Sequence, residues 1–445
     1  MHHNLSGAPH PMHPFIKSSL ILSACIATAL CARAADAPIV ATPDHPNGVY
    51  REGEPIHWQV KVTANGNAGA DSAAALSYVV KKGGLTPIAD GTISLEHGVG
   101  TLSSTLPESG TLLVEIKGGA NGSLKGAAGA VVAPEKIKVG VACPDDFDAF
   151  WKGKLAELEK VPVNPVLVPA GSEREGVRFE KVTLDNIHGT HVQGQIARPV
   201  SGTKFPAILQ LQYAGVYPLQ KGWVTEKAAK GWLALNILAH DLPIDESDAF
   251  YQAQMAGPLK NYTAIGNESR ETSYFLRMLL GDHRAVEYLA SRPDWDGKTL
   301  VVIGTSQGGI QSFFTAAYFP KVSAVIVEVP AGCDPGANAA GRAFGWPYWV
   351  ASHSGKAMET SRYYDAVHFA ARTECPLLVG VGLIDTTSPA GAVYAAFNSA
   401  QGSPKEIVPL PQGDHKTHHE EFLKRRDEWL KALVTGQPAP VAGSK

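Results

Sequence analysis

The sequence predicts a mixed α/β protein, in which a mostly parallel, doubly wound sheet follows an amino-terminal all-β sandwich of the immunoglobulin-like kind. Short β-rich runs with glycine and asparagine turns fill residues 41–138, as in a sandwich. After residue 143, nearly continuous apolar runs alternate with amphipathic helical patterns, as in a sheet covered on both faces. One apolar run leads into Gly304-Thr305-Ser306-Gln307-Gly308 and then a helical pattern, which is a strand, a tight turn and a helix in direct succession.

Length and composition describe a folded, nearly neutral protein. With 445 residues, of which 44% are hydrophobic, the chain can bury one large core and a smaller second one. The formal net charge is -3 and the pI is about 6.6. This balance supplies no basic face for nucleic acid or for an anionic membrane surface, so we expect neither partner.

The amino terminus has the pattern of an export signal. Lys17 precedes an apolar run over 20–30, and Ala32-Arg33-Ala34 is a small-residue cleavage site. We therefore expect a signal peptide over residues 1–35 and a periplasmic or secreted mature protein. Cys25 lies in a lipoprotein-like sequence, but the apolar run continues past it, so we expect cleavage rather than a lipid anchor. No later segment reaches the roughly 20 apolar residues of a membrane span.

Removal of the signal would leave Cys143, Cys333 and Cys375. Their odd number and wide spacing match neither a disulfide framework nor a zinc site. One disulfide and buried free thiols are equally compatible with this pattern.

The sandwich is expected over residues 36–140. Alternating apolar and polar residues, which give each sheet one buried face, mark most of its strands. The predicted strands are Ile56–Thr63, Leu76–Lys81, Gly91–Leu95, Val99–Leu106 and Thr111–Lys117. We interpret the glycine- and alanine-rich stretch Gly118–Ala130 as a loop. About 100 residues suit a spacer, a docking domain or a carbohydrate-binding module, and are too few for a propeller.

The second domain is expected over 141–436, with a flexible tail at 437–445. An acidic helix start at Pro144-Asp145-Asp146-Phe147-Asp148 opens it. Strands are predicted at Val177–Leu184, His191–Ala197, Pro206–Leu211, Trp232–Leu238, Ala324–Val329, Pro376–Val381 and Glu406–Leu410. Helices are predicted at Phe275–Leu289 and Gly308–Tyr318, and a terminal helix is predicted to end at Leu433. The long stretch Ala331–Arg372 is interpreted as a lid or a pocket wall.

Ser306 is the predicted nucleophile. A nucleophile elbow exposes such a serine on a strained strand-to-helix turn, where flanking glycines are needed because side chains have no room. The following helix directs its N–H groups toward the oxygen of an attacked carbonyl. The alternative is an ordinary tight turn whose serine caps the helix. The strand before the motif, the helix after it and the doubled glycine at Gly308-Gly309 favour the elbow.

A serine hydroxyl needs a base, and the base needs an acid that orients it. Both should follow the serine in the chain, at the carboxyl ends of strands. Asp385 follows the predicted strand Pro376–Val381, and Asp414-His415 follows the strand that ends at Leu410. Asp385 and His415 are therefore the predicted acid and base, and Asp414 is expected to point away.

Other residues compete for these roles. Asp334 and Asp365 lie in the long insertion, where Asp365 is expected to be solvated or to cap a helix. His418 and His419 are expected to be exposed in the first turn of the terminal helix. Together with Glu420 they resemble a metal cluster, but their spacing is not that of a zinc motif, so we expect no metal and no cofactor.

Two N–H groups should bind the oxyanion that forms when the carbonyl is attacked. One belongs to Gln307, directly after the nucleophile, and the other to Tyr213, in the loop after the strand Pro206–Leu211. Backbone donors leave little trace in side-chain identity, so these assignments rest on position in the chain.

The chain from about Pro144 to Leu433 resembles carbohydrate esterase family seven, the acetyl xylan esterases and cephalosporin-C deacetylases, which have the α/β-hydrolase fold. The resembling segments are Pro144–Asp148, the Gly-X-Ser-Gln-Gly-Gly elbow at Gly304–Gly309, Gly382–Asp385, Ala395–Asn398 and Pro404–Glu406. The resemblance implies Ser306, Asp385 and His415 as the triad, with Tyr213 and Gln307 as oxyanion donors.

Two departures from the family pattern stand out. The family's Arg-Gly-Gln motif is replaced by Ala239-His240-Asp241-Leu242-Pro243, and its usual His-Glu becomes His415-Lys416. The first change removes an arginine that helps to organise the site. The family's substrate range and hexameric assembly are therefore not carried over, and a homo-oligomer is one alternative among others. For His240 and Asp241 we expect a structural role in their loop, the alternative being support of the site or of the acyl pocket.

The sequence thus predicts an exported serine esterase that removes acetyl or other short acyl groups from sugar hydroxyls, as in acetylated xylan or oligosaccharides. One alternative is a serine peptidase of the prolyl oligopeptidase type, which shares the elbow and the triad order but needs a propeller. Another is a catalytically silent carbohydrate-binding protein, against which the complete set of Ser306, Asp385 and His415 argues.

Overall fold

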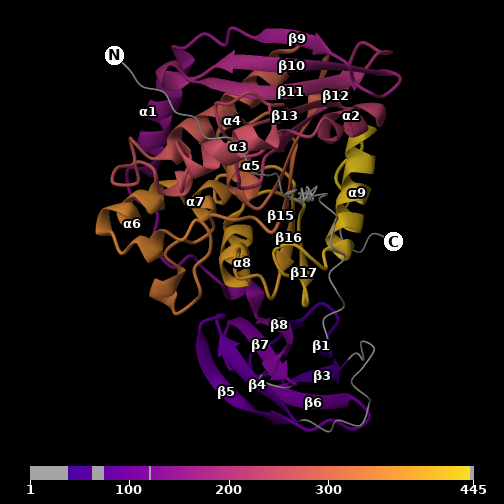
Figure 1. The fold of residues 1–445 in the computed structure, drawn as a ribbon, viewed down its shortest axis with the longest axis vertical. Helices are drawn as coiled ribbons and strands as arrows, with labels where there is room; N and C mark the ends of the chain where they lie inside the picture. Colours follow the sequence, from indigo (N-terminus) through magenta and orange to yellow (C-terminus); the bar gives the residue numbers. More distant parts are fainter. Residues whose placement is uncertain (1–38, 63–74, 120–121, 441–445) are drawn as a thin grey trace, which may run out of the picture. The chain divides into compact units, whose positions relative to one another are not determined.

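The computed structural model describes residues 39–62, 75–119 and 122–440 (Figure 1). The predicted signal peptide at 1–35 and the end of the predicted tail, residues 441–445, lie outside the described residues. Export therefore stays a prediction. No helix of the described residues is both long and apolar enough to cross a membrane.

The described residues between 39 and 132 form two β-sheets. One sheet has the order β1 (Ile39–Pro43), β3 (Ile56–Val62) and β6 (Val99–Ser104). The other has the order β2 (Val49–Tyr50), β8 (Leu124–Val132), β7 (Gly110–Gly118), β4 (Leu76–Lys82) and β5 (Thr86–Ile93). Trp58 and Val60 of the first sheet share one core with Leu112 and Val114 of the second, since alternate residues of a strand face inward. The predicted all-β sandwich is confirmed.

The expectation of a loop at Gly118–Ala130 is wrong, because most of this stretch forms β8 and pairs with β7. Glycine and alanine are poor strand formers, but here neighbouring atoms leave no room for larger residues. A Cβ on Gly126 would lie 2.4 Å from the carbonyl oxygen of Ile39, and one on Gly129 would lie 2.3 Å from that of Leu383. Close approach of neighbouring atoms therefore explains the glycines at these two positions.

The large sheet, which has nine strands, has the order β17-β16-β15-β14-β12-β13-β11-β10-β9. Its strands are β9 (Val166–Ala170), β10 (Val177–Asp185), β11 (His191–Pro199), β12 (Phe205–Leu211), β13 (Leu233–Ile237), β14 (Trp295–Thr305), β15 (Ala324–Glu328), β16 (Leu377–Gly382) and β17 (Lys405–Leu410). The six strands β13, β12, β14, β15, β16 and β17, neighbours in that order, pair in parallel. The strands β9, β10, β11 and β13, neighbours in that order, pair antiparallel. The predicted mostly parallel α/β sheet is confirmed.

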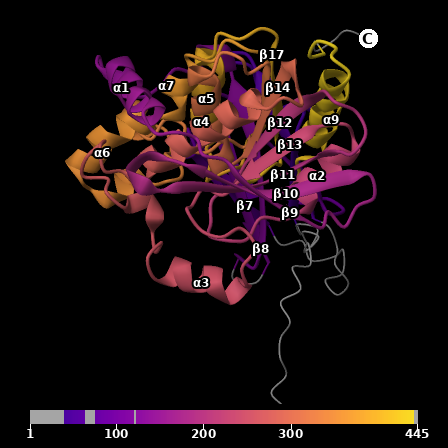
Figure 2. The same ribbon diagram turned by 90° about the horizontal axis from the view of Figure 1, so that it is seen from above.

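Helices cover both faces of this sheet (Figures 1 and 2). They are α1 (Phe147–Glu159), α2 (Gly222–Ala229), α3 (Asp248–Ala256), α4 (Tyr274–Ser291), α5 (Gln307–Tyr318), α6 (Gly355–Ser361), α7 (Ala366–Ala370), α8 (Ala390–Ser399) and α9 (Glu420–Val434). Val302 of β14 belongs to the core beneath α4 and α5, whereas its neighbour Val301 belongs to the core beneath α2 and α9. The near-continuous apolar runs follow from this double burial.

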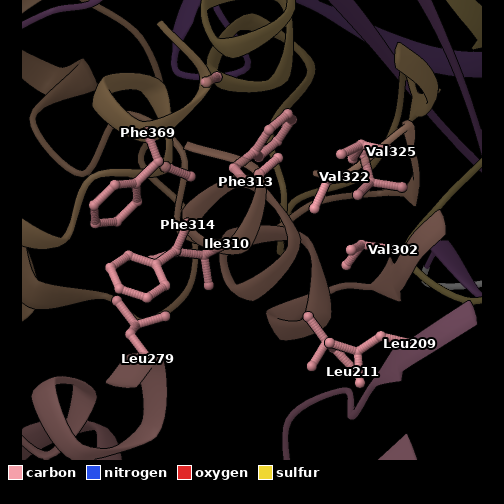
Figure 3. Packing of buried hydrophobic residues seen from close by; sticks show 14 of the residues in the cluster. Leu209, Leu211, Leu279, Val302, Ile310, Phe313, Phe314, Val322, Val325 and Phe369 are labelled. Atoms are coloured by element: carbon pink, nitrogen blue, oxygen red, sulfur yellow. The ribbon is translucent and has the colours of Figure 1, made fainter. Parts of the chain in front are cut away.

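Helix α5 is held on several sides by apolar contacts (Figure 3). Phe313 and Phe314 are fully buried, and the ring of Phe314 meets that of Phe369 of α7 edge to face at 5.2 Å between centroids. Leu279 of α4 belongs to the same core. Such packing fixes the start of α5, where Ser306 is located.

The long insertion packs on the main core, to which its residues Trp349 and Tyr364 belong. Its two aspartates are buried. Asp365 caps α7 by accepting a hydrogen bond from Val367 N at 2.8 Å, and Asp334 pairs with Arg342. The capping expectation for Asp365 is therefore confirmed, and the expectation that it is solvated is wrong.

Candidate active site

Ser306 lies between β14 and α5 with φ 57° and ψ −119°. A positive φ is costly for a residue other than glycine, so the surroundings must hold this conformation. The Ser306 N–H donates to the carbonyl oxygen of Glu328 at 3.0 Å. The Ser306 carbonyl accepts hydrogen bonds from Gly309 N at 2.8 Å and from Ala331 N at 2.9 Å. The turn thus has the strained geometry of a nucleophile elbow.

The glycines around Ser306 are required by space. A Cβ on Gly304 would lie 2.1 Å from the carbonyl oxygen of Gly308, and a Cβ on Gly309 would lie 2.4 Å from Cβ of Pro330. These distances are far inside van der Waals contact. The crowding that the sequence motif predicts is therefore present.

The structure brings the three predicted triad residues together. His415 Nε2 lies 2.8 Å from Ser306 Oγ, and His415 Nδ1 lies 2.7 Å from Asp385 Oδ2. The other oxygen of Asp385 accepts from the backbone N–H groups of Thr387 at 2.7 Å and Ser388 at 2.8 Å. An ionised Asp385 can only accept, so Nδ1 carries the imidazole proton and Nε2 is free to take one from the serine.

Asp414 shapes the turn that presents His415. Its Oδ1 accepts from Lys416 N at 2.6 Å and from Thr417 N at 2.8 Å. Burial alone would raise the pKa of this carboxyl, but these backbone donors outweigh it and lower the pKa. Asp414 is thus bonded within its own turn, in agreement with the expectation that Asp385 contacts the base.

The loop after β12 lies beside the start of α5. Leu211 pairs with Gly304 in the parallel register of β12 and β14, so Tyr213 and Ser306 each lie two residues beyond a paired position. A Cβ on Gly308 would lie 2.8 Å from the carbonyl oxygen of Leu211. The backbone segments that carry Tyr213 and Gln307, the two predicted oxyanion donors, are therefore close neighbours.

His240, from the segment Ala239–Pro243 after β13, binds this loop. Arg277 donates to the hydroxyl of Tyr274 at 2.9 Å, and that hydroxyl lies 2.7 Å from His240 Nδ1. His240 Nε2 lies 3.0 Å from the carbonyl oxygen of Gly215. Burial lowers the pKa of His240 to about 4, so the ring is neutral, accepts from Tyr274 and donates to Gly215. This contact favours the alternative that His240 supports the site.

Asp241, the neighbour of His240, binds a different segment. It accepts hydrogen bonds from His191 N at 2.8 Å and from Gln193 Nε2 at 3.2 Å. These contacts tie its loop to β11, as the structural expectation for Asp241 requires.

Tyr262 links both segments of the predicted oxyanion site, and the sequence reasoning missed it. Its hydroxyl lies 2.5 Å from Gln307 Oε1 and accepts from Gly215 N at 3.3 Å. The Gln307 side chain continues to Gln311, whose Nε2 donates to Asp282 at 2.7 Å. Tyr262 lies in a short 3-10 turn outside any motif, so only the tertiary structure reveals its contacts.

The expectation that His418 and His419 are exposed holds for His418 only. His419 is buried, with Nδ1 2.9 Å from Glu328 Oε1 and Nε2 2.7 Å from the carbonyl oxygen of Asp414. The ion pair compensates for the burial of the ring. Both ring nitrogens are occupied, and among the described residues no cluster of histidine, cysteine, aspartate and glutamate could hold a metal ion.

A cavity of about 680 Å³ lies between α2, α9 and the sheet. Tyr213 and Thr305 line it together with Trp223, Lys227 and Arg426, whereas the three predicted triad residues do not. The cavity is therefore next to the site rather than part of it.

The three cysteines within the described residues, Cys143, Cys333 and Cys375, are free thiols. The sequence was compatible with one disulfide or with free thiols, and the described residues have free thiols.

Comparison with known proteins gives consistent results. A family model described as acetyl xylan esterase (AXE1) matches residues 136–338 and 348–433. The acetyl esterase Axe7A of Xylanibacter ruminicola is 28% identical over 410 residues, which cover 89% of this chain and 90% of that protein.

Two solved structures share the fold over about two thirds of the chain. The acetyl xylan esterase from Paenibacillus sp. R4 has a TM-score of 0.57 at 21% identity, covering 66% of this chain and 97% of its own. Acetyl xylan esterase 1 from Thermoanaerobacterium sp. has a TM-score of 0.58 at 20% identity, covering 67% and 97%. At these identities the likeness concerns the fold alone.

Proposed function

This chain belongs to the acetyl xylan esterase family and is a carboxylic-ester hydrolase, and we propose that it removes acetyl groups from carbohydrate hydroxyls through an acyl-enzyme on Ser306. The observation that carries the proposal is the arrangement of His415, with Nε2 2.8 Å from Ser306 Oγ and Nδ1 2.7 Å from Asp385 Oδ2. This arrangement can activate a hydroxyl without any further group.

The reaction has two similar halves. Ser306 Oγ attacks the ester carbonyl carbon while its proton passes to His415 Nε2, and the N–H groups of Gln307 and Tyr213 bind the oxyanion. When the C–O bond to the sugar breaks, His415 gives its proton to the departing sugar oxygen. Water then attacks the acetyl-serine while His415 takes its proton, and His415 returns this proton to Ser306 Oγ as that oxygen separates from the acetyl carbon and acetate leaves. Asp385 keeps the ring oriented and stabilises the imidazolium throughout.

The substrate class rests on the names of similar proteins, which are acetyl xylan esterases and an acetyl esterase. The peptidase alternative has no comparable support, since the described residues before 133 form a two-sheet sandwich. The leader-like sequence at 1–35 supports action outside the cytoplasm. A mature amino terminus near Ala34 or Ala35 in the periplasmic or secreted fraction would support export, and a chain that keeps Met1 and stays in the cytoplasmic fraction would contradict it.

The decisive experiment compares Ser306→Ala with the wild-type enzyme on acetylated xylan, acetylated oligosaccharides and a prolyl peptide. We expect acetate release by the wild type only, with kcat of the variant reduced by roughly 10⁴-fold or more. Ser312→Ala, at a second buried serine six residues further along in α5, is the matched control and should keep its activity. Peptide cleavage without acetate release, or an active Ser306→Ala, would overturn the proposal.

A further inference from the structure

The β-sandwich contacts the loops that carry Asp385 and His415, and we propose that it is a brace that sets the positions of these two side chains. The inference rests on the proposed function, because it concerns the same triad. The sandwich and the large sheet belong to one compact unit, Ala37–Lys445. The family model begins to match only at residue 136, so this brace lies outside the matched residues.

The first contact is with the loop of the acid. Leu383 lies two residues before Asp385 and packs against Gly129 of β8 so closely that a Cβ on this glycine would be 2.4 Å from that of Leu383. On Gly48, which has φ 65°, a Cβ would lie 3.0 Å from Cδ1 of Leu383. Two segments of the sandwich therefore leave Leu383 no space to move toward them.

The second contact is with the loop of the base. The N–H of Gly129 donates to the carbonyl oxygen of Pro411 at 2.8 Å. Gln412 Nε2 donates to the carbonyl oxygen of Ala41 at 2.8 Å and to Thr42 Oγ1 at 3.2 Å. Pro411 and Gln412 lie four and three residues before His415. Gly129 thus contacts both loops at once.

The two loops are also bonded to each other at this point. Leu383 N donates to the carbonyl oxygen of Leu410 at 2.9 Å, and Ile384 N donates to that of Gly413 at 3.1 Å. A displacement at Gly129 would therefore reach the acid loop and the base loop together.

The third contact is with the long insertion. Ala343 N donates to the carbonyl oxygen of Gly83 at 2.8 Å, in the turn between β4 and β5. Three residues further along, Trp346 N donates to the carbonyl oxygen of Thr387 at 2.8 Å. Thr387 N in turn donates to Asp385. The sandwich is therefore connected to the acid from both sides of its loop.

These contacts distinguish a brace from a spacer or a separate binding module, which needs no close packing against the acid and base loops. Catalysis depends on reacting groups being held to within a fraction of an ångström, and a misplacement of about 1 Å costs on the order of 10²-fold in rate. A side chain added at Gly129 should consequently affect the rate of acyl transfer more than substrate binding.

The test uses two glycines of the same strand in the full chain. Gly129→Ala adds a methyl group against Leu383, whereas Gly126→Ala adds one against Ile39, inside the sandwich, where the Cβ would be 2.4 Å from a carbonyl oxygen. Gln412→Ala removes the side-chain hydrogen bonds to β1 without adding volume. If Gly129→Ala does not fold, Gln412→Ala alone tests whether the sandwich positions the triad. For each variant we would measure kcat and KM for a soluble acetyl ester, the rate at which a fluorophosphonate labels Ser306, and Tm.

We expect kcat and the labelling rate of Gly129→Ala to fall by roughly 10- to 100-fold, with KM changed by less than about 3-fold. Gln412→Ala should show a smaller fall in the same two rates, and Gly126→Ala should lower Tm but keep both rates. The brace is overturned if folded Gly129→Ala and Gln412→Ala react at the wild-type rates, or if Gly126→Ala slows labelling as much as Gly129→Ala. An active Ser306→Ala would instead overturn the proposed function itself, so the two failures are distinguishable.

Discussion

His419 forms an ion pair with Glu328, with Nδ1 2.9 Å from Oε1. Its other ring nitrogen lies 2.7 Å from the carbonyl oxygen of Asp414. A carboxylate and a carbonyl only accept hydrogen bonds, so both ring nitrogens carry protons and His419 is an imidazolium. Glu328 also accepts from Thr305 Oγ1 at 3.0 Å. The ion pair therefore connects Asp414, the residue before the proposed base, to Thr305, the residue before the proposed nucleophile.

Replacement of His419 should destabilise the protein in a pH-dependent way. Burial alone would lower the pKa of His419, but the bonds to Glu328 and Asp414 raise it above 6.5. The stabilisation is therefore full below pH about 6.5 and is lost as the pH rises through the folded-state pKa. We expect His419→Gln to cost about 2 kcal/mol of unfolding free energy at pH 6 and less at pH 9, by urea denaturation.

The exposed neighbour provides the control for this measurement. His418→Gln should leave the unfolding free energy unchanged at both pH values. A cost for His419→Gln that is the same at pH 6 and pH 9 would mean that the ring is not charged in the folded protein.

Loss of the Tyr262 hydroxyl should lower kcat with little change in KM. Tyr262→Phe removes the donor to Gln307 and the acceptor for Gly215 N, so both segments of the proposed oxyanion site lose a shared contact. Because the oxyanion forms only as the carbonyl is attacked and is absent from the bound ester, we expect kcat to fall roughly 10-fold. Tyr251→Phe is the matched control, since this buried hydroxyl bonds to Pro243 instead. An equal loss of kcat in both variants would contradict the proposal that the Tyr262 hydroxyl acts by linking Gln307 to Gly215.

His240 should be replaceable by a neutral donor but not by an apolar residue. Its pKa of about 4 makes it neutral at working pH, so its contribution is the hydrogen bond to Gly215 rather than charge. His240→Gln should retain several-fold more activity than His240→Leu, which leaves a buried carbonyl unsatisfied. The kcat values of the wild type and of His240→Gln, measured from pH 6 to pH 9, should differ by a constant factor. A factor that changes with pH would point to a charged ring.

Asp385→Asn should nearly abolish acetate release without unfolding the protein. The amide can donate to His415 Nδ1 and so stabilise the wrong tautomer of the base, for which a loss in kcat of about 10⁴-fold is typical. Asp414→Asn keeps an oxygen for the N–H groups of Lys416 and Thr417 and should stay within about 3-fold of wild type. Comparable losses in the two variants would contradict the assignment of the acid.

The sequence predicts the parts of the site that depend on local pattern and strand order. Ser306, Asp385 and His415 follow β14, β16 and β17, and the ends of neighbouring parallel strands lie at one edge of the sheet. Their meeting therefore follows from a correct assignment of three strands. The two-sheet sandwich likewise follows from the alternation of its strands.

What the sequence could not predict depends on contacts between distant segments. The burial of His419 requires Glu328, which is 91 residues earlier, and no local feature of the His418-His419 pair reveals it. Position 129 of strand β8 is a glycine because Leu383, 254 positions later, packs against it, so this glycine does not mark a loop. Tyr262 shows no pattern before its partners Gly215 and Gln307 are placed in space.

The hydrogen bonds around His240 and Tyr262 all run in one direction. Arg277 donates to Tyr274, Tyr274 to His240, and His240 to the carbonyl of Gly215; the N–H of Gly215 then donates to Tyr262, which donates to Gln307. Each hydroxyl proton has a single assignment, and the bond dipoles align head to tail. At the proposed oxyanion site beside Gln307, none of these groups has to turn when negative charge develops, so we expect the surroundings to need little reorganisation during the reaction.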